Sequence, residues 1–266
     1  MPTPSGKEWG YPWVVRSPGA AASTDPACQT RDVADRSGVF FGASSVFGSP
    51  RRWPDSDLIG MSEEFGPELA VAGYRAGVFP MPQHGFRGRR LMGWYSPLDR
   101  GILPLDGLRV SRSLRKMIKR YAITVDTAFD EVIRRCGDPS RPGGWIDERI
   151  LQVYTGLHQA GIVHSVEART ADGRLAGGLY GVSIGGLFAG ESMFHDPVIG
   201  RDASKAALVA LVDLLRGDGQ DRLLDVQWQT PHLASLGVIE IPREDYLRRL
   251  AVAVTLPAPD FRAPAG

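Results

Sequence analysis

Three consecutive β-strand patterns lie in the second half of this chain, and they constrain its fold more than any other feature. They cover residues 162–169, 174–182 and 186–194. The connections between them, Ala171-Asp172-Gly173 and Ile184-Gly185-Gly186, contain the residues typical of hairpin turns. Strands joined by such short turns pair with their neighbours in antiparallel orientation. We therefore expect an antiparallel meander at the centre of the fold.

Helical and strand patterns lie on both sides of this meander. Before it, the sequence predicts a helix over 110–120, a strand over 121–126 and helices over 129–136 and 147–160. After it, the sequence predicts a helix over 204–215, a strand over 223–228, a helix over 243–250 and a last strand over 251–256. A mixed, mostly antiparallel sheet flanked by helices is an α+β arrangement.

The regular pattern begins only at residue 108, which suggests a division of the chain. Residues 1–38 mix Pro, Gly, Ser and Ala without helical or strand periodicity, and we interpret them as a flexible N-terminal extension. Residues 39–107 are interrupted by Gly and Pro and contain one helical pattern, at 67–77. We expect a small N-terminal domain over 39–107 and a larger domain over 108–266.

Composition excludes several classes of protein. The 266 residues carry a net charge of +1, so the surface as a whole is not that of a nucleic-acid-binding protein, although a local basic patch remains possible. Two cysteines, Cys28 and Cys136, do not make a disulfide framework, which favours a reducing, cytoplasmic setting. The chain has no apolar run long enough to span a membrane and no signal-peptide pattern at its N-terminus.

Motifs for several common chemistries are missing. The five histidines do not occur in a zinc-binding spacing such as HxxxH, and the chain has no GxxxxGK[ST] phosphate-binding loop. It also has no GxSxG motif for a serine nucleophile. We therefore expect neither a metal nor nucleotide hydrolysis.

Two polar features occur inside apolar strand patterns. Asp225 and Gln227 are two residues apart on a predicted strand, so they project from one face, either into a cleft or into solvent at a sheet edge. Glu191 lies in the otherwise apolar strand that ends the meander, beside Met193. A carboxylate in such surroundings needs a partner, either in a structural ion pair or in a site.

Aromatic and basic residues suggest nucleic-acid contacts. Trp94 and Trp145 lie next to Gly or Pro in loops, where a tryptophan either stacks on a base or fills a core. Residues 109–120 contain six basic and no acidic residues. The basic residues that share one helix face are Arg112, Arg115, Lys116 and Lys119. A stripe of one sign favours a phosphate backbone over a merely solvated face.

The succession of elements resembles the architecture of acetyl-CoA-dependent N-acetyltransferases. That fold binds the coenzyme pyrophosphate in a basic, glycine-rich turn that opens a helix after the central strand. The corresponding stretch here, residues 196–205, has no Gly-x-Gly pattern. Coenzyme A is therefore disfavoured as the acyl donor.

Several short motifs identify a narrower resemblance. They include Tyr74-Arg75-Ala76-Gly77-Val78-Phe79-Pro80, Trp94-Tyr95-Ser96-Pro97, Gly144-Trp145-Ile146, Gly190-Glu191-Ser192-Met193-Phe194, Ala203-Ser204-Lys205 and Asp225-x-Gln227. Over about residues 39–258 they resemble, in the same order, the bacterial leucyl/phenylalanyl-tRNA–protein transferase family. This resemblance implies a small N-terminal domain, an acetyltransferase-like C-terminal domain, and no metal or coenzyme.

The resemblance also implies an activity. Such a protein transfers Leu, Phe or Met from aminoacyl-tRNA to the α-amino group of a protein that begins with Arg or Lys, which marks that protein for degradation. We expect a cytoplasmic monomer without membrane contact. The alternatives are a coenzyme-A-dependent N-acyltransferase of the same fold and a tRNA-binding protein without catalytic activity.

Roles for individual residues follow from the same resemblance. Asp225 orients Gln227, whose amide oxygen accepts a proton of the incoming amine, and Glu191 lies near the acceptor's basic side chain. We favour orientation over base catalysis, since an amide is hardly basic. The residues expected to hold the terminal adenosine and aminoacyl group are Trp94, Trp145 and Tyr154. Those expected to form an apolar pocket are Phe188, Met193 and Leu208. Those expected to bind tRNA phosphates are Arg112, Arg115, Lys116, Lys119 and Arg120.

Overall fold

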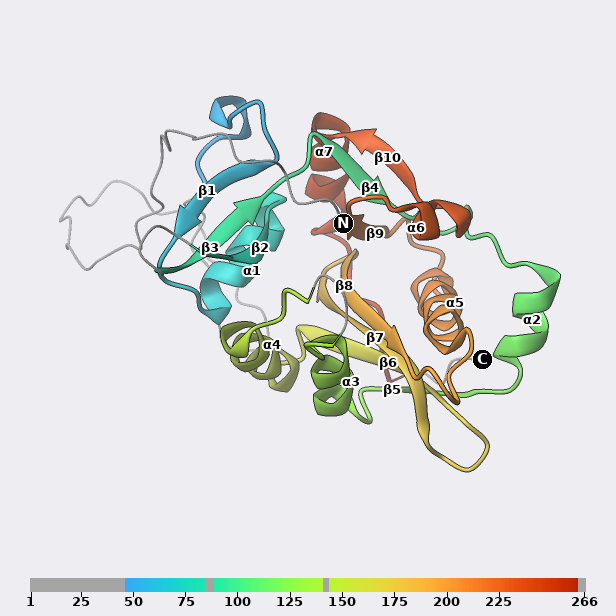
Figure 1. Ribbon diagram of the computed structural model, residues 1–266. Helices are drawn as coiled ribbons and strands as arrows, with labels where there is room; N and C mark the ends of the chain where they lie inside the picture. Colours follow the sequence, from blue (N-terminus) through green and yellow to red (C-terminus); the bar gives the residue numbers. More distant parts are fainter. Residues whose placement is uncertain (1–45, 85–88, 141–143, 263–266) are drawn as a thin grey trace.

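The expected meander is present as strands β6 (Val163–Arg169), β7 (Leu175–Ile184) and β8 (Leu187–His195), which pair antiparallel in sequence order. Figure 1 shows the computed structural model, which describes residues 46–84, 89–140 and 144–262. The expected extension, residues 1–38, lies outside the described residues. All ten residues of β7 are buried, because helices cover both of its faces.

The meander belongs to a seven-stranded sheet with the order β10-β4-β9-β8-β7-β6-β5. The strands added to it are β4 (Asp99–Ile102), β5 (Ala122–Val125), β9 (Leu223–Gln227) and β10 (Ile239–Pro242). Only β8 and β9 are parallel, and the connection between them contains helix α5 (Ala203–Arg216). The sheet is therefore mixed and mostly antiparallel, as predicted.

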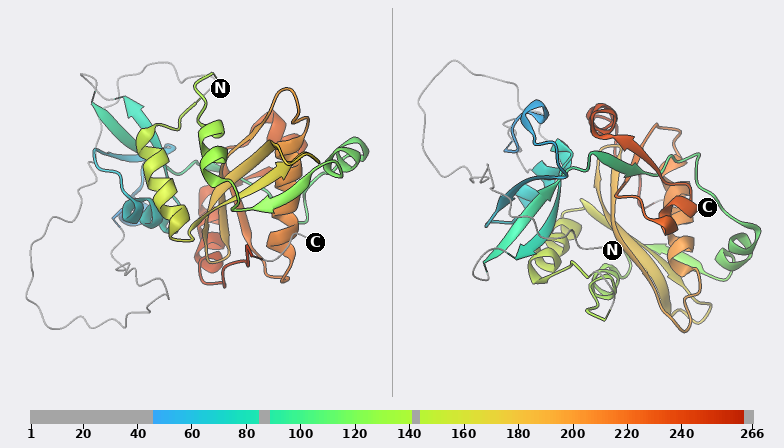
Figure 2. Two further views of the ribbon diagram at one scale, coloured as in Figure 1. Left: turned by 90° about the horizontal axis from the view of Figure 1, so that it is seen from below. Right: turned by 45° about the horizontal axis from the view of Figure 1, so that its top comes forward.

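Helices pack on both faces of this sheet, as the left view of Figure 2 shows. Helix α5 covers one face with apolar residues such as Leu208 and Leu211. Helices α3 (Phe129–Cys136) and α4 (Glu148–Gln159) cover the other, and Asp147 caps α4 by accepting from the backbone N–H groups of Arg149 and Ile150. None of the helices in the described part of the chain is both long and apolar enough to cross a membrane.

A separate three-stranded sheet, with the order β1-β3-β2, lies beside the large one. Its strands are β1 (Leu58–Ser62), β2 (Phe79–His84) and β3 (Arg90–Tyr95), preceded by the short helix η1 (Pro50–Arg52). Helix α1 (Pro67–Ala76) packs against it and ends at Gly77, whose φ of 87° is left-handed. These elements form most of the expected small domain, but β4, within residues 39–107, already belongs to the large sheet.

The prediction for the C-terminal part was partly wrong. Residues 251–256 do not form a strand, because helix α7 (Arg243–Ala253) continues into them. The alternating apolar residues there suggested a strand, but Leu250 and Ala253 are both buried on one side of the helix. Helix α2 (Arg112–Ile118) is shorter than expected, and the loop after β9 contains helix α6 (Pro231–Ser235).

Strands β8 and β9 separate partway along their length, and this separation positions the site. Their pairing runs from Leu187 with Leu223 to Ala189 with Asp225 and then stops. At the same level β8 has an irregularity: Tyr180 pairs with Ser192 and Gly181 with Gly190, so Glu191 is the extra residue. Such bulges redirect side chains and occur often beside functional sites.

The close packing of α5 on the sheet leads to a stability prediction. A Cβ atom at Gly177 would lie 2.7 Å from the Cβ of Ala203 and 2.9 Å from the backbone N of Ser204. We expect Gly177→Ala to lower the free energy of unfolding by about 1–3 kcal/mol, measured by urea denaturation, since α5 has to move. The control is Gly156→Ala on α4, where no atom lies within 4 Å and a small gain in stability is expected. Unchanged stability of Gly177→Ala would contradict the packing described.

Candidate functional site

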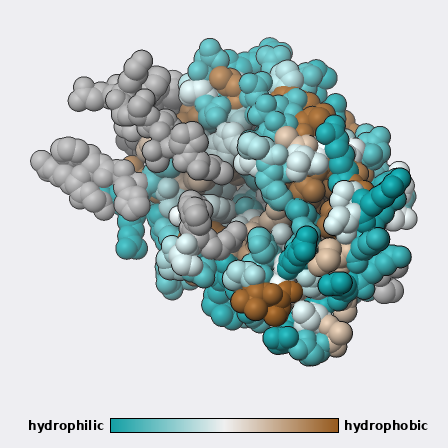
Figure 3. Space-filling model, turned by 45° about the vertical axis from the view of Figure 1, so that its right-hand side comes forward, coloured by the Kyte–Doolittle hydropathy of each residue, from teal (hydrophilic) through white to brown (hydrophobic). Residues whose placement is uncertain are grey.

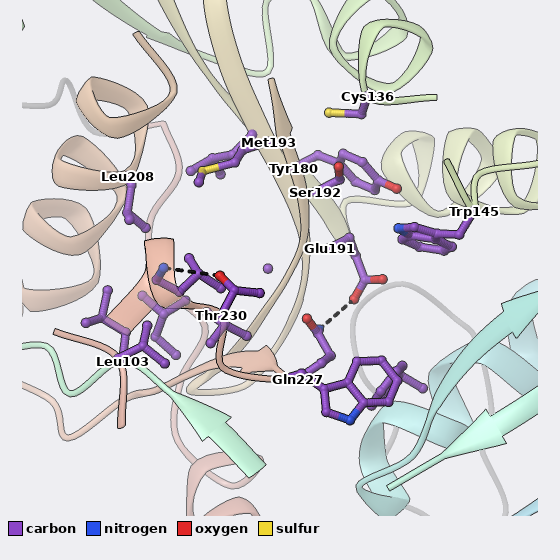
Figure 4. A pocket seen from close by; sticks show the side chains of 18 of the residues that line it. Leu103, Cys136, Trp145, Tyr180, Glu191, Ser192, Met193, Leu208, Gln227 and Thr230 are labelled. Carbon is purple, nitrogen blue, oxygen red and sulfur yellow. Dashed lines mark hydrogen bonds between the residues drawn. The ribbon is translucent and has the colours of Figure 1, made fainter. Parts of the chain in front are cut away.

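A pocket of about 410 Å³ lies where β8 and β9 have separated (Figure 4). One side of it is apolar. The residues of that wall are Leu103, Leu179, Met193, Leu208, Leu211, Leu224, Val226, Leu233 and Val238. The other side carries Cys136, Trp145, Tyr180, Glu191 and Gln227. The pocket therefore combines room for an apolar group with a small set of polar atoms at one end.

A buried ion pair lies behind the pocket. The Nε of Arg100 donates to Oδ1 of Asp225 at 2.8 Å, and its Nη2 donates to Oδ2 at 2.5 Å. The Tyr246 hydroxyl donates to the same carboxylate at 2.9 Å, and Nη1 of Arg100 donates to the carbonyl of Gly77 at 3.2 Å. Burial alone lowers the pKa of Arg100, but the negative charge of Asp225 outweighs it and the pKa is raised. The guanidinium thus remains charged.

Asp225 also fixes the backbone that carries Gln227. Its Oδ1 accepts from the backbone N–H of Gln227 at 3.0 Å, and Gln227 has a φ of 61°, in the left-handed region. A non-glycine residue in this region is strained and is common at functional sites. Gly101 lies opposite in the paired strand, where a Cβ would be 2.9 Å from the backbone of Trp228. The Gln227 side chain is thereby directed into the pocket (Figure 4).

Gln227 and Glu191 meet across the gap between the two strands. The Nε2 of Gln227 donates to Oε1 of Glu191 at 3.3 Å, so the amide oxygen is left facing the pocket (Figure 4). The Tyr154 hydroxyl donates to Oε2 of Glu191 at 3.4 Å and is itself hydrogen-bonded to the Tyr74 hydroxyl. These contacts link both domains to one carboxyl group.

The surroundings of Glu191 favour its protonated form. Burial raises the pKa of Glu191 to about 8, and the nearby negative charge of Asp225 acts in the same direction. Hydrogen bonding by Tyr74 and Tyr154 and the charge of Arg100 oppose this change but do not cancel it. A positively charged group placed beside Glu191 would favour its ionised form.

The structure brings together some of the predicted site residues and not others. Trp145, Met193 and Leu208 line the pocket with Glu191 and Gln227. Asp225 is fully buried behind it, and Tyr154 lies behind Glu191. Phe188 is packed in the core beneath α5.

Trp94 lies away from the pocket. It is fully buried in the small domain, where its indole N–H donates to the hydroxyl of Ser62 at 2.9 Å and its ring packs on Phe47 and Phe65. It fills a core, which is one of the two interpretations that its sequence context allowed. Direct contact of Trp94 with an adenosine in the pocket therefore does not follow from the structure.

The predicted basic residues lie on and just after α2, which packs beside α5 on the side away from β8 (Figure 1). The exposed side chains are Arg112, Arg115, Lys116, Lys119 and Arg120. Ser111 caps the helix by accepting from the backbone N–H of Leu114, which is buried. Figure 3 shows mainly hydrophilic side chains on this side of the molecule.

Sequence reasoning missed Arg100, Tyr246, Trp228 and Asp57. Trp228 lines the pocket directly after Gln227, and its indole N–H donates to Oδ2 of Asp57 at 3.1 Å. The other oxygen of Asp57 accepts from the backbone N–H of Leu98 at 2.9 Å. The only available signal was that a buried Asp225 requires a cation, which does not say which arginine supplies it.

The described residues contain no group of three or more His, Cys, Asp or Glu side chains placed to hold a metal ion. The polar side chains that line the pocket include one amide, one carboxyl group, the imidazole of His232 and several hydroxyls. This set can orient an uncharged or cationic substrate by hydrogen bonding.

The raised pKa of Glu191 predicts a pH-dependent stability. Its pKa in the folded state lies above the value of 4.5 for a free glutamate, so the folded state retains the proton between about pH 4.5 and 8. Stability contributed by this group therefore falls as the pH rises through that window. We expect Glu191→Gln to gain stability relative to the wild type from pH 5 to pH 8 in urea denaturation. The control, Glu240→Gln at an exposed position, should follow the wild type. A difference between Glu191→Gln and wild type that is constant with pH would contradict the burial of this carboxyl group.

Comparison with known proteins places this site in a family. The family model described as "Leucyl/phenylalanyl-tRNA protein transferase" matches residues 102–251, and the model of its N-terminal domain matches residues 63–98. The L-PGS protein of Bacillus licheniformis superposes with a TM-score of only 0.34 at 13% identity, over 66% of this chain and 57% of that chain.

Two relatives are similar over nearly their whole length. The leucyl/phenylalanyl-tRNA–protein transferase of Rubrobacter xylanophilus is 47% identical over 192 residues, which are 71% of this chain and 95% of that protein. That of Herpetosiphon aurantiacus is 46% identical over 197 residues, 73% of this chain and 97% of that protein. With this family model spanning strands β5 to β10 and most of the residues that line the pocket, this chain belongs to the leucyl/phenylalanyl-tRNA–protein transferase family.

Proposed function

We propose that this protein transfers Leu, Phe or Met from aminoacyl-tRNA to the α-amino group of proteins that begin with Arg or Lys, in the cytoplasm. The observation that carries the proposal is the meeting of Gln227 and Glu191 at the end of an apolar pocket, in a chain of this family. The product would be a protein with a new N-terminal residue that marks it for degradation. The proposed organisation is a small N-terminal domain followed by a catalytic domain, expected at 39–107 and 108–266, with the boundary moved to before β4 because that strand belongs to the large sheet.

The apolar wall is the proposed site for the transferred side chain. Met193 and Leu208 face each other across it, from β8 and α5 (Figure 4). An apolar pocket distinguishes side chains that differ by one methylene by only about 1–3 kcal/mol. Acceptance of several apolar amino acids is therefore expected.

Gln227 is the proposed orienting group for the reaction. The amine nitrogen attacks the ester carbonyl carbon, a C–N bond forms, the C–O bond to the ribose breaks, and the ribose oxygen takes up a proton from the amine. The ester is already activated, so alignment supplies most of the catalysis, up to about 7–11 kcal/mol for well-placed groups. The amide oxygen of Gln227 accepts a hydrogen bond from the amine and aims its lone pair. Asp225 acts behind it, through the backbone N–H of Gln227.

Glu191 and Trp145 are the proposed contacts for the two substrates at the polar end. A basic side chain of the acceptor placed beside Glu191 would ionise it and form an ion pair. Trp145 is only partly buried, so its ring can stack on the terminal adenine, a contact worth about 1–3 kcal/mol. The rest of the tRNA would lie along α2.

The transfer reaction tests the proposal directly. Labelled Leu-tRNA or Phe-tRNA is supplied with two otherwise identical proteins, one that begins with Arg and one with Ala. We expect label on the first only, and a loss of at least about 100-fold in rate for Gln227→Ala, because alignment of the amine is lost. Gln227 is the better variant than Asp225, since truncating Asp225 leaves Arg100 buried without its partner.

Other outcomes of this experiment identify other functions. Label on neither protein, with tRNA shown to be active, contradicts the proposal. Retained tRNA binding would then indicate a binding protein without turnover. Transfer of acetyl groups from acetyl-coenzyme A without tRNA would indicate a coenzyme-dependent acyltransferase.

The α2 helix predicts a salt-dependent interaction with tRNA. Reversing charge in Lys116→Glu with Lys119→Glu should weaken tRNA binding and reduce the slope of log K against log salt concentration by roughly 1 for each phosphate that is no longer neutralised. A filter-binding titration at several salt concentrations measures the slope. The matched control reverses two exposed charges on α7, Arg248→Glu with Arg249→Glu, and should leave the slope nearly unchanged. Equal slopes for wild type and the α2 variant would rule out phosphate binding there.

A further inference from the structure

Tyr180 lines the pocket, and its hydroxyl is buried and has no hydrogen-bond partner among the described residues. The other buried tyrosine hydroxyls near the site are paired: Tyr74 with Tyr154, and Tyr246 with Asp225. An unpaired buried hydroxyl is destabilising, and such groups are rare in native proteins. A hydroxyl kept unpaired in the wall of a binding pocket indicates that a ligand supplies its partner.

The ring of Tyr180 is held in a fixed position. It makes edge contacts with Phe129 and Tyr154, at centroid distances of 6.0 and 5.9 Å and interplanar angles of 90° and 87°. Figure 4 shows its hydroxyl directed toward Trp145, at the same end of the pocket as Glu191. The ring is therefore fixed by packing before a ligand binds.

This end of the pocket is suited to a cation with several N–H groups. Glu191, Ser192 and Tyr180 all offer oxygen acceptors, and Trp145 offers an aromatic face. No lysine or arginine is among the described residues that line the pocket. Burial, together with the charge of Glu191, raises the pKa of Tyr180 well above its usual value, so its oxygen belongs to a neutral phenol.

We infer that the Tyr180 hydroxyl accepts a hydrogen bond from the guanidinium of an acceptor protein's N-terminal arginine, and that it favours arginine over lysine at that position. The inference rests on the proposed function, which brings a basic side chain to Glu191. A guanidinium has five N–H donors in a planar fork, so it can bind Glu191 and Tyr180 together along the face of Trp145. The ammonium group of lysine has three N–H donors that diverge from one nitrogen, so it does not present the parallel, planar donors of a guanidinium to two acceptors.

The test compares Tyr180→Phe with the wild type on two acceptor peptides that differ only in beginning with Arg or Lys. We expect KM for the Arg peptide to rise about tenfold, as for loss of one hydrogen bond to a charged group, and KM for the Lys peptide to change little. The kcat and the KM for aminoacyl-tRNA should stay unchanged. The melting temperature should be equal or higher, since the substitution removes an unpaired hydroxyl.

Ser183→Ala is the matched control. Ser183 lies on the same strand and also has a buried, unpaired hydroxyl, but it does not line the pocket. This variant should leave both peptide KM values unchanged. A loss of peptide affinity in Ser183→Ala equal to that in Tyr180→Phe would assign both effects to the strand and overturn the inference.

Further outcomes separate the inference from the function on which it rests. A higher KM for aminoacyl-tRNA would place the hydroxyl on the adenosine instead, and equal effects on the Arg and Lys peptides, or no effect on either, would also overturn the inference. If the wild type transfers nothing to the Arg peptide, the proposed function itself fails.

A second test needs only the wild type: a peptide that begins with dimethylated arginine keeps its charge but loses N–H donors, and its KM should rise to that of the Lys peptide. An unchanged KM there would contradict the inference even if Tyr180→Phe did not fold.

Discussion

The buried pair of Arg100 and Asp225 is the interaction on which the rest of the site depends. Both side chains are almost completely removed from water, at 1% and 0% exposure. Taking two charges out of water costs several kcal/mol for each ion, so neither is tolerable without the other. The pair also forms hydrogen bonds with separate segments of the chain. Arg100 donates to the carbonyl of Gly77 after α1, and the Tyr246 hydroxyl on α7 donates to Asp225. This contact adds to the pairing of β9 with β4 and β8 in fixing the position of β9 relative to both domains.

The pocket is formed by the separation of strands β8 and β9 next to this ion pair. Strands β8 and β9 are held together only up to Ala189 and Asp225, and the bulge at Glu191 turns its carboxyl group toward the gap. Gln227 completes the arrangement from the other strand by adopting a strained backbone conformation. The two polar groups are thus in contact although the strands that carry them no longer pair at this level. The apolar wall of the pocket consists of core residues that the separation of the strands leaves uncovered.

Local patterns predicted most of this fold, and long-range contacts account for most of what was missed. The meander, helices α3 and α5 and the Asp225-x-Gln227 motif follow from periodicity and spacing within a few residues. Strand β4 was missed because its four residues, Asp-Arg-Gly-Ile, have no alternating pattern and become a strand only by pairing with β9 and β10. Trp94 and Trp145 have similar sequence surroundings, and only tertiary structure separates the core residue from the one at the pocket.

Asp57 has a consequence for how the protein selects its acceptors. One carboxylate holds both the backbone that leads into β4 and the ring of Trp228 beside Gln227, and the guanidinium of Arg243 donates to the carbonyls of Pro54, Ser56 and Ser96 in the same region. The two domains are therefore fastened to each other at the mouth of the pocket. Separating the pocket walls would break several of these hydrogen bonds at once, because Trp228 lines the pocket. We therefore expect a protein whose first residues are packed into its own fold to be a poor acceptor, whatever its N-terminal amino acid.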